Sequence, residues 1–597
     1  MKLKAYAVTA SIFFSAVLVG CGGGGGGGSS VGSANPVPTV LVSANTQTAL
    51  QGETVAITWS STNANTCSAS GSWNGQLSAS GTQSSAAITT GSNTYTVTCT
   101  NGTTTANSSV IVVGSTSETF AGKIYSRTQN TLFNANDVSP TLLSGATISL
   151  GTRTSLSDNN GNYSEIIPSK ILAIDTFNIA ENGYIPISIA RSLIDTSTPS
   201  SNIGLYSAPI VNSRPGFVGG VFTMDAGGDL NTIINSGLFP STYSRIKTKI
   251  GANLVAVSDP VWVESYDAAS ATVRMSSTSS IPMLTRQQYM ALVGLAHSNN
   301  MKFMMQLGIY PAGNLQLPWS VPASNTAFWT AWFNSYKAIA IQYAQIAKDL
   351  NIEYISLGMN HGFMSSLPIS YWSDLISAVR NTGYTGKIVY QAMVNPGSYF
   401  ESDGFNIASS DNSLTTQQKN LQFVNLFDSI VLNTYNIVVK SGSSNSVSRS
   451  DMRTSITSLL NKFTNYPVPL MVQVATPSVF GGAVNTDYIE PCLACNSIAP
   501  TQTMDLMQQA DVYEALAEVI NGTPTGNGNV MGLISWGYWF TDNFRTNVTN
   551  LSIGINSDGS LINSTGTPIE TAYDKSANIR GKPAESVLGW WISKFIN

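Results

Sequence analysis

The sequence predicts a multidomain chain in which two β-sandwiches are followed by a (β/α)8 TIM barrel. The first observation is length, because 597 residues are too many for one ordinary domain. The second is that residues 36–114 are rich in Ser and Thr and alternate apolar with polar positions, as half-buried strands do. The third is that, from Val218 onward, short apolar runs alternate with long amphipathic segments, a pattern typical of parallel strands joined by helices.

The composition indicates a folded protein with an uncharged polar surface. Charged residues make up 10% of the chain, against about 25% in a typical soluble protein. Apolar residues make up 42%, so the chain can bury substantial cores and is not disordered by composition. The net charge is -4 and no basic run is present, which argues against nucleic acid as a partner. Such a surface suits an extracellular protein of β-sandwiches and loops.

The N-terminus has the layout of a bacterial export signal. Lys2 and Lys4 form a short positive region, and Ala10–Val19 supplies an apolar segment. This segment ends in Leu-Val-Gly-Cys at Cys21, which resembles the lipobox of bacterial lipoproteins. The resemblance implies a signal peptide over residues 1–20 and lipid chains on Cys21 that anchor the protein to a membrane. A plain secretory signal with a chance cysteine is the alternative.

The residues that follow the lipobox indicate a flexible tether and the membrane to which the protein is sorted. Residues 21–35 contain the glycine run Gly22–Gly28, which we expect to be flexible. No aspartate follows Cys21, and in bacterial lipoproteins this favours the outer membrane, on its surface or its periplasmic face. No later segment has the ~18 continuous apolar residues that span a bilayer.

Four further cysteines fall into two well-separated pairs, which predicts the disulfides Cys67–Cys99 and Cys492–Cys495. An oxidising compartment outside the cytoplasm permits both. The second pair forms a CxxC sequence, which in other settings is a redox motif or half of a zinc site. We favour a loop disulfide because no second pair of ligands lies nearby in the sequence.

Residues 36–114 are predicted to form the first β-sandwich. Val55–Trp59 and Tyr95–Cys99 alternate as half-buried strands. A cysteine on each of two strands, with a Trp close to the first, suggests a sandwich stapled by a disulfide. The run Thr58–Cys67, together with the second strand, resembles bacterial immunoglobulin-like modules. Such modules are usually spacers, and direct ligand binding is the alternative.

Residues 118–209 are predicted to form the second β-sandwich. The strand Leu142–Leu150 and the turn Ser157–Tyr163 resemble, in their order, the carboxypeptidase-regulatory-like domains. Within that turn Asn160-Gly161 predicts a β-hairpin, because both residue types tolerate positive φ. Nothing in this region gathers catalytic groups, so we expect it to be structural.

Residues 211–597 are predicted to form the barrel. Trp329–Leu350 places apolar side chains at three- and four-residue steps, which predicts an amphipathic helix with one buried stripe. Eight strand–helix units in roughly 380 residues fit a TIM barrel. The predicted strands are Val218–Asp225, Leu254–Val261, Lys302–Ile309, Tyr354–Asn360, Lys387–Val394, Ser429–Tyr435, Leu470–Val474 and Gly532–Trp536.

The working residues of a TIM barrel lie at the C-terminal ends of its strands. In this sequence those ends are rich in amides and aromatics and poor in charge. Aromatic faces stack on sugar rings and amides hydrogen-bond to hydroxyl groups, so the pattern favours a saccharide cleft. The candidate substrate-binding residues are Trp262, Tyr310, Gln391, Asn433, Tyr435, Trp536 and Tyr538, with Gln306 on the same rim.

Three segments carry a resemblance to a known family. They are Ile250–Val257 around the second strand, Ala296–Met305 around the third strand, and Arg580–Glu585 before the last helix. In this order they resemble clan-A glycoside hydrolases, and most closely the β-mannanase-type family 113. The resemblance implies a TIM barrel whose family chemistry uses two carboxylates, about 5 Å apart in retaining enzymes.

The two positions at which the family carries its carboxylates hold amides here. The fourth-strand motif Gly-Thr-Glu stands as Gly358-Met359-Asn360, and the seventh-strand position holds Gln473. Neither amide can donate a proton as an acid or act as an ordinary nucleophile. Tyr435 and Trp536 match the family's sixth-strand Tyr and eighth-strand Trp, which shape the sugar site. The resemblance therefore implies that the binding residues are better preserved than the catalytic pair.

Other residues could replace the missing carboxylates. Asp225 and Asp259 lie near the C-terminal ends of the first two strands, and His361 follows the fourth strand, so each could do general acid–base work. Asp487 and Glu490 lie on the loop after the seventh strand, and the plainer interpretation of each is a solvated charge. No metal-ligand cluster, phosphate-binding loop or dinucleotide fingerprint is present in the sequence, so we expect no metal and no cofactor.

The sequence favours a cell-envelope lipoprotein whose barrel binds a polysaccharide or oligosaccharide without cleaving it, which would make it a pseudoenzyme. Two alternatives stay open. An active, β-mannanase-like glycoside hydrolase would need two displaced carboxylates that face one cleft. A structural or adhesive envelope protein would use the barrel to bind another protein.

Overall fold

The computed structural model describes most of the chain from Val37 onward. None of the helices in the described ranges combines the length and the apolar character needed to cross a bilayer. The described residues are 37–127, 141–150, 153–168, 176–190, 202–223, 238–277, 283–312, 315–318, 320–358, 367–394, 413–434, 438, 447–463, 466–478, 480–483, 505–524, 529–538, 554–555, 561–562 and 577–597.

By their contacts these residues form two compact units. The first consists mainly of residues up to Glu118, and the second contains the remaining β-strands of the N-terminal half together with the whole barrel. A short antiparallel pair, β25 (Gly554–Ile555) and β26 (Leu561–Ile562), belongs to the first unit.

The first unit contains two sheets, with strand orders β1-β3-β6 and β2-β8-β7-β4-β5. Buried residues from both sheets form one hydrophobic cluster, as alternation predicts. At its centre Trp73 packs edge-on against Trp59 and Tyr95, with ring centroids 5.6 and 5.7 Å apart. The strands are β1 (Thr39–Ala44), β2 (Thr48–Leu50), β3 (Ala56–Thr62), β4 (Thr66–Gly71), β5 (Gly75–Leu77), β6 (Ser80–Ser84), β7 (Gly91–Thr100) and β8 (Thr105–Ser115).

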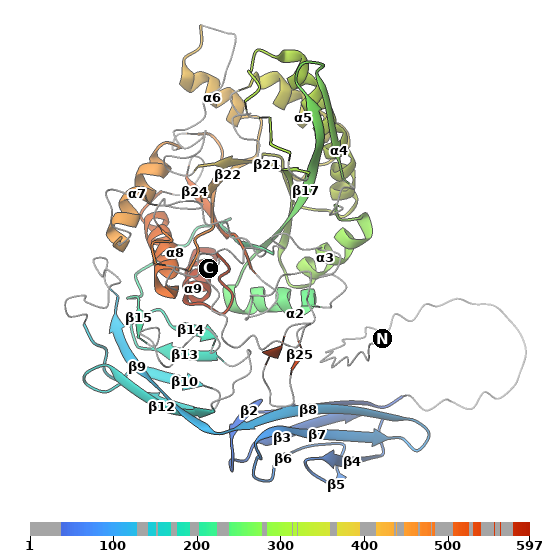
Figure 1. The fold of residues 1–597 in the computed structure, drawn as a ribbon, viewed down its shortest axis with the longest axis vertical. Coiled ribbons are helices and arrows are strands. Elements are labelled where there is room, and N and C mark those ends of the chain that lie inside the picture. The colour runs from blue at the N-terminus through green and yellow to red at the C-terminus, as the bar shows by residue number, and fades with distance from the viewer. Residues whose placement is uncertain are drawn as a thin grey trace, which may run out of the picture. The chain divides into compact units, whose positions relative to one another are not determined.

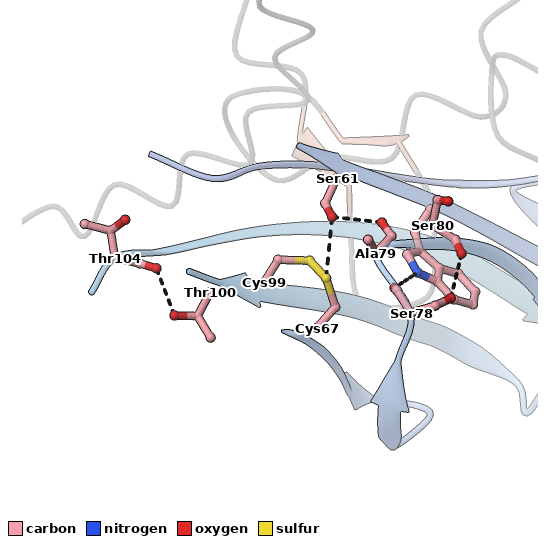
Figure 2. Close-up of a disulfide and its surroundings, with 9 residues drawn as sticks. Ser61, Cys67, Ser78, Ala79, Ser80, Cys99, Thr100 and Thr104 are labelled. Atoms are coloured by element: carbon pink, nitrogen blue, oxygen red, sulfur yellow. Dashed lines mark hydrogen bonds between the residues drawn. A yellow bond between two sulfur atoms is a disulfide. The ribbon is translucent and has the colours of Figure 1, made fainter. Parts of the chain in front are cut away.

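The predicted disulfide Cys67–Cys99 is present, and it links neighbouring strands of one sheet (Figure 2). Cys67 of β4 and Cys99 of β7 are partners in the antiparallel register, so the bond does not join two sheets as the sandwich staple would. Ser61 of β3 approaches it, with Oγ 3.6 Å from the Cys67 sulfur, and also donates to the Ala79 carbonyl at 2.8 Å. The structure shows two sheets that share one hydrophobic core. That they form an immunoglobulin-like sandwich stays a prediction.

Two smaller sheets follow in the second unit, with orders β11-β10-β13-β14 and β12-β9-β15. Phe120 of β9 joins them, because its ring packs against Phe177 of β13 at 4.2 Å and Tyr163 of β12 at 5.4 Å. The strands are β9 (Ser117–Ser126), β10 (Thr147–Leu150), β11 (Arg153–Leu156), β12 (Asn162–Pro168), β13 (Thr176–Ala180), β14 (Ile187–Ala190) and β15 (Ile203–Leu205).

The turn at Asn160-Gly161 differs from the predicted hairpin, because β11 and β12 lie in different sheets. Asp158 organises the turn: its carboxylate accepts from the backbone N–H of Asn160 and Asn162, each at 2.8 Å. Gly161 has φ 67°, and a Cβ there would lie 2.5 Å from the Ile124 carbonyl oxygen. The residue types therefore predict a tight turn, and a tight turn is present. The chain passes through this turn from one sheet to the other instead of forming a hairpin.

The predicted barrel is confirmed: eight parallel strands close into a ring, because β16 pairs with both β24 and β17 (Figure 1). A ninth strand, β18, pairs antiparallel with β17. The barrel strands are β16 (Val218–Phe222), β17 (Leu254–Asp267), β19 (Lys302–Pro311), β20 (Tyr354–Ser356), β21 (Lys387–Met393), β22 (Ser429–Thr434), β23 (Leu470–Val474) and β24 (Val530–Ser535), and β18 is Thr272–Ser276.

Helices surround this ring of strands (Figure 1). The stripe predicted in the long helix is buried, including Trp329, Trp332 and Tyr336, so these aromatics pack rather than bind. The helices are α2 (Leu238–Arg245), the π-helix η3 (Ile246–Ile250), α3 (Arg286–Ser298), α4 (Thr326–Asp349), α5 (Ile369–Asn381), α6 (Thr416–Val424), α7 (Arg449–Asn461), α8 (Leu506–Asn521) and α9 (Pro583–Ile596).

Strand β17 is longer than the predicted Leu254–Val261. Its second half leaves the ring and forms a hairpin with β18, pairing Trp262 with Ser276 and Asp267 with Thr272. The hairpin lies against α4, where Ser335 donates to the Val273 carbonyl at 3.0 Å. The β17–β18 hairpin therefore extends the sheet beyond the C-terminal end of the barrel.

Candidate functional site

The C-terminal halves of the barrel strands carry a layer of inward-facing polar side chains. Met304, Val389 and Met471 belong to the hydrophobic cluster inside the barrel. Side chains alternate along a strand, so the residues two positions later face the same interior. The same rule applied to β17, β20 and β22 adds two serines and one asparagine. The polar layer consists of Ser258, Gln306, Ser356, Gln391, Asn433 and Gln473, of which all but the half-buried Ser258 are fully buried.

Three glutamines of this polar layer form a hydrogen-bonded chain. The Gln306 amide N–H donates to the Gln391 side-chain carbonyl, and the Gln391 N–H donates to that of Gln473 at 2.8 Å. The Ser356 hydroxyl also donates to Gln391 Oε1, at 3.5 Å. Within the described residues, Gln306 Oε1 and Gln473 Nε2 have no hydrogen-bond partner although both atoms are buried. The chain thus ends in a free acceptor on β19 and a free donor on β23.

Two aromatic side chains lie at the rim above the polar layer. Trp262 of β17 and Tyr310 of β19 are half-buried, and their ring centroids are 5.9 Å apart. The Tyr310 hydroxyl lies 3.4 Å from the Ser258 hydroxyl, which connects the rim to the polar layer. The two strands pair Trp262 directly with Tyr310, so the sheet itself brings the rings together. Both residues were predicted to bind substrate, and their position is compatible with that role.

Trp536 and Tyr538 occupy different environments from this rim. Trp536 is 4% exposed and packs on Phe222 inside the barrel, with ring centroids 5.1 Å apart. Tyr538 is fully buried, and its hydroxyl donates to Glu585 and accepts from Arg245 at 3.0 Å. Burial, reinforced by the Glu585 charge, raises the pKa of Tyr538 well above its usual range. The structure thus places Tyr538 in a buried polar contact with Glu585, which differs from the predicted sugar contact.

Asp259 lies on the outer face of its strand, because its neighbour Ser258 faces inward. Its carboxylate accepts from the Tyr289 hydroxyl at 2.7 Å and from the Leu284 N–H at 3.1 Å. Burial raises the pKa of Asp259 to about 7, and these two hydrogen bonds oppose the rise. This placement corrects the hypothesis of a substitute catalytic acid, since the carboxylate faces helix α3 rather than the barrel interior.

Several predicted residues lie outside the described residues. These are Cys21, Asp225, Asn360, His361, Tyr435, Cys492 and Cys495. The fourth-strand motif is therefore described only at Gly358, where a Cβ would lie 2.6 Å from the Gln391 backbone nitrogen. A glycine at this position lets the end of β20 approach β21 closely.

The chemistry of the polar layer follows from its residue types. Amides and hydroxyls both donate and accept hydrogen bonds without carrying charge, which suits the hydroxyl groups of a sugar. No carboxylate belongs to the polar layer as far as the structure describes it. Nor does any cluster of His, Cys, Asp and Glu in the described ranges have an arrangement that could hold a metal ion.

Sequence reasoning missed Ser258 and Ser356 and selected Asp259. It selected residues near the C-terminal end of each predicted strand and did not use the alternation of side chains along the strand. Counting in steps of two from the apolar residues Ala256 and Tyr354 would have found both serines. The same count would have assigned Asp259 to the outer face, since a one-residue shift moves a side chain to the other side of a sheet.

The sequence matches the model of Glycoside Hydrolase Family 113 over residues 263–403. The match runs from the β17 hairpin past the end of β21, so it contains Asn360 and Gln391 and ends before Gln473. A search of curated proteins gives no match.

Solved structures that a search matches to this chain include a GH113 β-1,4-mannanase complex, with 16% identity and a TM-score of 0.42, covering 63% of this chain and 99% of that one. The GH113 β-mannanase AaManA from Alicyclobacillus acidocaldarius gives 18% identity and a TM-score of 0.42, covering 63% of this chain and 97% of the other. A GH18 chitinase from Pseudoalteromonas aurantia gives 11% identity and a TM-score of 0.29, covering 53% and 92%. Similarity at this level says nothing about the substrate of this chain.

Proposed function

We propose that the barrel binds a polysaccharide or oligosaccharide and does not cleave it. The observation that carries the proposal is the uncharged polar layer at the C-terminal strand ends, which lies beneath the Trp262–Tyr310 pair. Hydroxyl-rich ligands need many donors and acceptors and an apolar ring face to stack on. Both are supplied here, at the end of the barrel where TIM-barrel proteins bind their ligands.

The absence of cleavage is inferred from chemistry. Hydrolysis of a glycosidic bond ordinarily needs one carboxyl group to protonate the leaving oxygen and a second to act as nucleophile or base. We infer that Gln473, near the C-terminal end of the seventh strand of the ring, occupies the position of the second group. Its amide neither ionises nor donates a proton as an acid, and Asp259 faces away from the interior.

We further propose that the protein works at the cell envelope. Lipid chains on Cys21 would anchor it to the outer membrane, and the glycine run that follows would let the folded units reach a polysaccharide at some distance. The disulfide Cys67–Cys99 supports export, since such bonds persist in oxidising compartments.

The test is a paired assay on the full-length protein purified in detergent. Binding and the release of reducing ends would be measured on mannans, glucans, chitin and peptidoglycan. We expect binding without release, and we expect Trp262→Ala to weaken binding at least about tenfold, or ~1.4 kcal/mol. Trp590→Ala is the matched control, because Trp590 is also a partly buried tryptophan but lies on α9 beside Lys594.

Trp262 is preferred to Trp536 for this test, because truncating a barrel-core side chain would leave a cavity and destabilise the fold. Release of reducing ends by the wild-type protein would overturn the proposal and favour the active hydrolase. Binding to no glycan in the panel would favour the structural or adhesive alternative.

A further inference from the structure

The chain of three glutamines has a direction. Gln306 donates to Gln391, and Gln391 donates to Gln473, so in both hydrogen bonds the donor lies on the β19 side and the acceptor on the β23 side. Gln391 is the central member, and the Ser356 hydroxyl also donates to its carbonyl. Because the carbonyl of Gln473 is engaged by Gln391, the amide group of Gln473 cannot rotate freely. Its Nε2 is left without a partner in the described part of the chain.

We propose that Gln391 is a positioning residue, which fixes the amide of Gln473 so that its N–H faces a bound sugar. The proposal rests on the glycan-binding function proposed above and adds which atoms recognise the ligand. Gln473 would donate to a ligand oxygen, while the free carbonyl of Gln306, at the other end of the chain, would accept from a ligand hydroxyl.

The direction of the glutamine chain also determines which ligand group each of its two ends can bind. A hydroxyl group can accept from Gln473 and another can donate to Gln306, so a neutral sugar satisfies both ends. An ionised carboxylate can accept but cannot donate, and it would leave the Gln306 carbonyl buried without a partner. We therefore infer that the ligand group facing the Gln306 carbonyl is a hydroxyl and not a carboxylate.

The first test needs no ligand and asks whether the glutamine chain exists. Unfolding midpoints in denaturant would be measured for Gln391→Met, Gln473→Met and the double variant of the full-length protein. Each single change leaves a buried amide atom unpaired, so we expect the double variant to lose clearly less than the sum of the two single losses. Additive losses would overturn the proposal, whether or not any glycan binds.

The second test uses pH as a readout that a merely structural role would not change. In Gln391→Glu the ionised side chain cannot donate to the Gln473 carbonyl, so the Gln473 amide should turn its N–H toward the new carboxylate. We expect affinity for β-1,4-mannohexaose or cellohexaose to fall at least about tenfold at pH 8 and to recover as the pH is lowered to 5. At pH 5 the buried carboxyl group regains its proton and can donate again.

The wild-type affinity should be flat across the same range. The neighbours that face Gln391 are the uncharged members of the polar layer on β19, β20, β22 and β23. The titratable groups on the interior face around them, among the described residues, include the phenols of Tyr310 and Tyr354 and, at the start of β21, the ammonium group of Lys387, which lies 5.9 Å from the centroid of the Tyr354 ring. Phenols ordinarily ionise near pH 10, and burial raises the pKa of Tyr354 further.

Gln287→Glu is the matched control, because Gln287 is exposed on α3 and gains a charge without burying it. If the wild-type protein binds a probe and Gln391→Glu binds it equally at all pH values, the positioning role is overturned while glycan binding stands. If the wild-type protein binds neither these probes nor any glycan of the panel above, the proposed function fails, and the stability cycle still decides whether the glutamine chain exists.

Discussion

At the residue scale, Asp259 shows how burial converts a candidate acid into a structural group. The carboxylate is fully buried on the outer face of β17, and its pKa is raised to about 7, mainly by desolvation. It receives hydrogen bonds from Tyr289 in α3 and from the backbone of Leu284 just before that helix. The residue therefore holds the start of α3 against the barrel.

This raised pKa makes a prediction about stability and pH. The folded protein holds the Asp259 proton up to about pH 7, whereas the unfolded chain releases it near the ordinary value of 3.8. The stabilising contribution is therefore complete below about pH 4 and is lost as the pH rises through 7. In Asp259→Asn this loss should vanish, so the free energy of unfolding should decline less between pH 5 and 8, by an amount on the order of a few kcal/mol.

Denaturant unfolding at pH 5 and pH 8 measures this difference. Some decline should persist in the variant, because burial also raises the pKa of Asp505 to about 6 and that of Glu514 to about 8. Asp267→Asn is the control, since its exposed carboxylate has a lowered pKa and stays ionised in this range. Parallel pH curves for the wild-type protein and Asp259→Asn would contradict the assignment.

At the element scale, the disulfide of the first unit joins two neighbouring strands. Cys67 and Cys99 are register partners on β4 and β7 and are separated by 32 residues in the sequence. The bond therefore closes a loop that contains β5 and β6 rather than tying one sheet to the other. Its main effect should be to limit the freedom of the unfolded chain.

Replacing both cysteines by alanine should lower the stability of the first unit by roughly 3–4 kcal/mol, the value for a loop of this length. Hydrogen exchange followed by mass spectrometry can localise the effect. Amides of β4 and β7 should exchange faster, while those of α4 in the barrel should be unchanged and serve as the internal control. If the amides of β4 and β7 exchange at the same rate in the variant as in the wild-type protein, the disulfide contributes little to the stability of the first unit.

At the scale of the whole molecule, a buried ion pair in the second unit joins the barrel to the sheet that contains β9 and β15. Arg127, directly after β9, binds both carboxylate oxygens of Asp511 in α8, and the two side chains are 1% and 2% exposed. Tyr206, after β15, donates to the same carboxylate at 2.8 Å. Arg449 of α7 lies over the Tyr206 ring, with its guanidinium 5.2 Å from the ring centroid.

Such a contact predicts that the stability of the barrel depends on this sheet. Removing one partner leaves a buried charge unpaired, so Arg127→Met should cost about 3–5 kcal/mol of stability. Arg127→Met combined with Asp511→Leu should cost much less than the sum of the two single changes. Thermal unfolding of the four proteins measures this coupling, and additive losses would show that the pair is not formed.

The contact of Arg127 and Tyr206 with Asp511 also means that the barrel is not complete without the strands before it. A fragment that starts near Ala208 would lack both Arg127 and Tyr206 and would leave the Asp511 carboxylate without two of its partners. Experiments on binding therefore need the full chain.

Local patterns in the sequence sufficed for much of this architecture. The eight short apolar runs from Val218 onward predicted the barrel strands, since strands buried on both faces must be apolar along their length. The periodic aromatics of α4 predicted its buried face, and the spacing of the cysteines predicted the bond between Cys67 and Cys99. The sequence also predicted that amide side chains gather at one end of the barrel, because the C-terminal ends of all barrel strands lie at the same face.

The tertiary structure alone decided which groups meet. The partners Arg127 and Asp511 are 384 residues apart, and no periodicity relates them. Tertiary pairing also placed β11 and β12 in different sheets, Asp259 against α3, and Tyr538 against Glu585. The sequence by itself determined secondary structure and the faces that must be buried, because those depend on neighbours a few residues away. The partner of each buried polar group depends on how distant segments pack, and only the folded chain determines it.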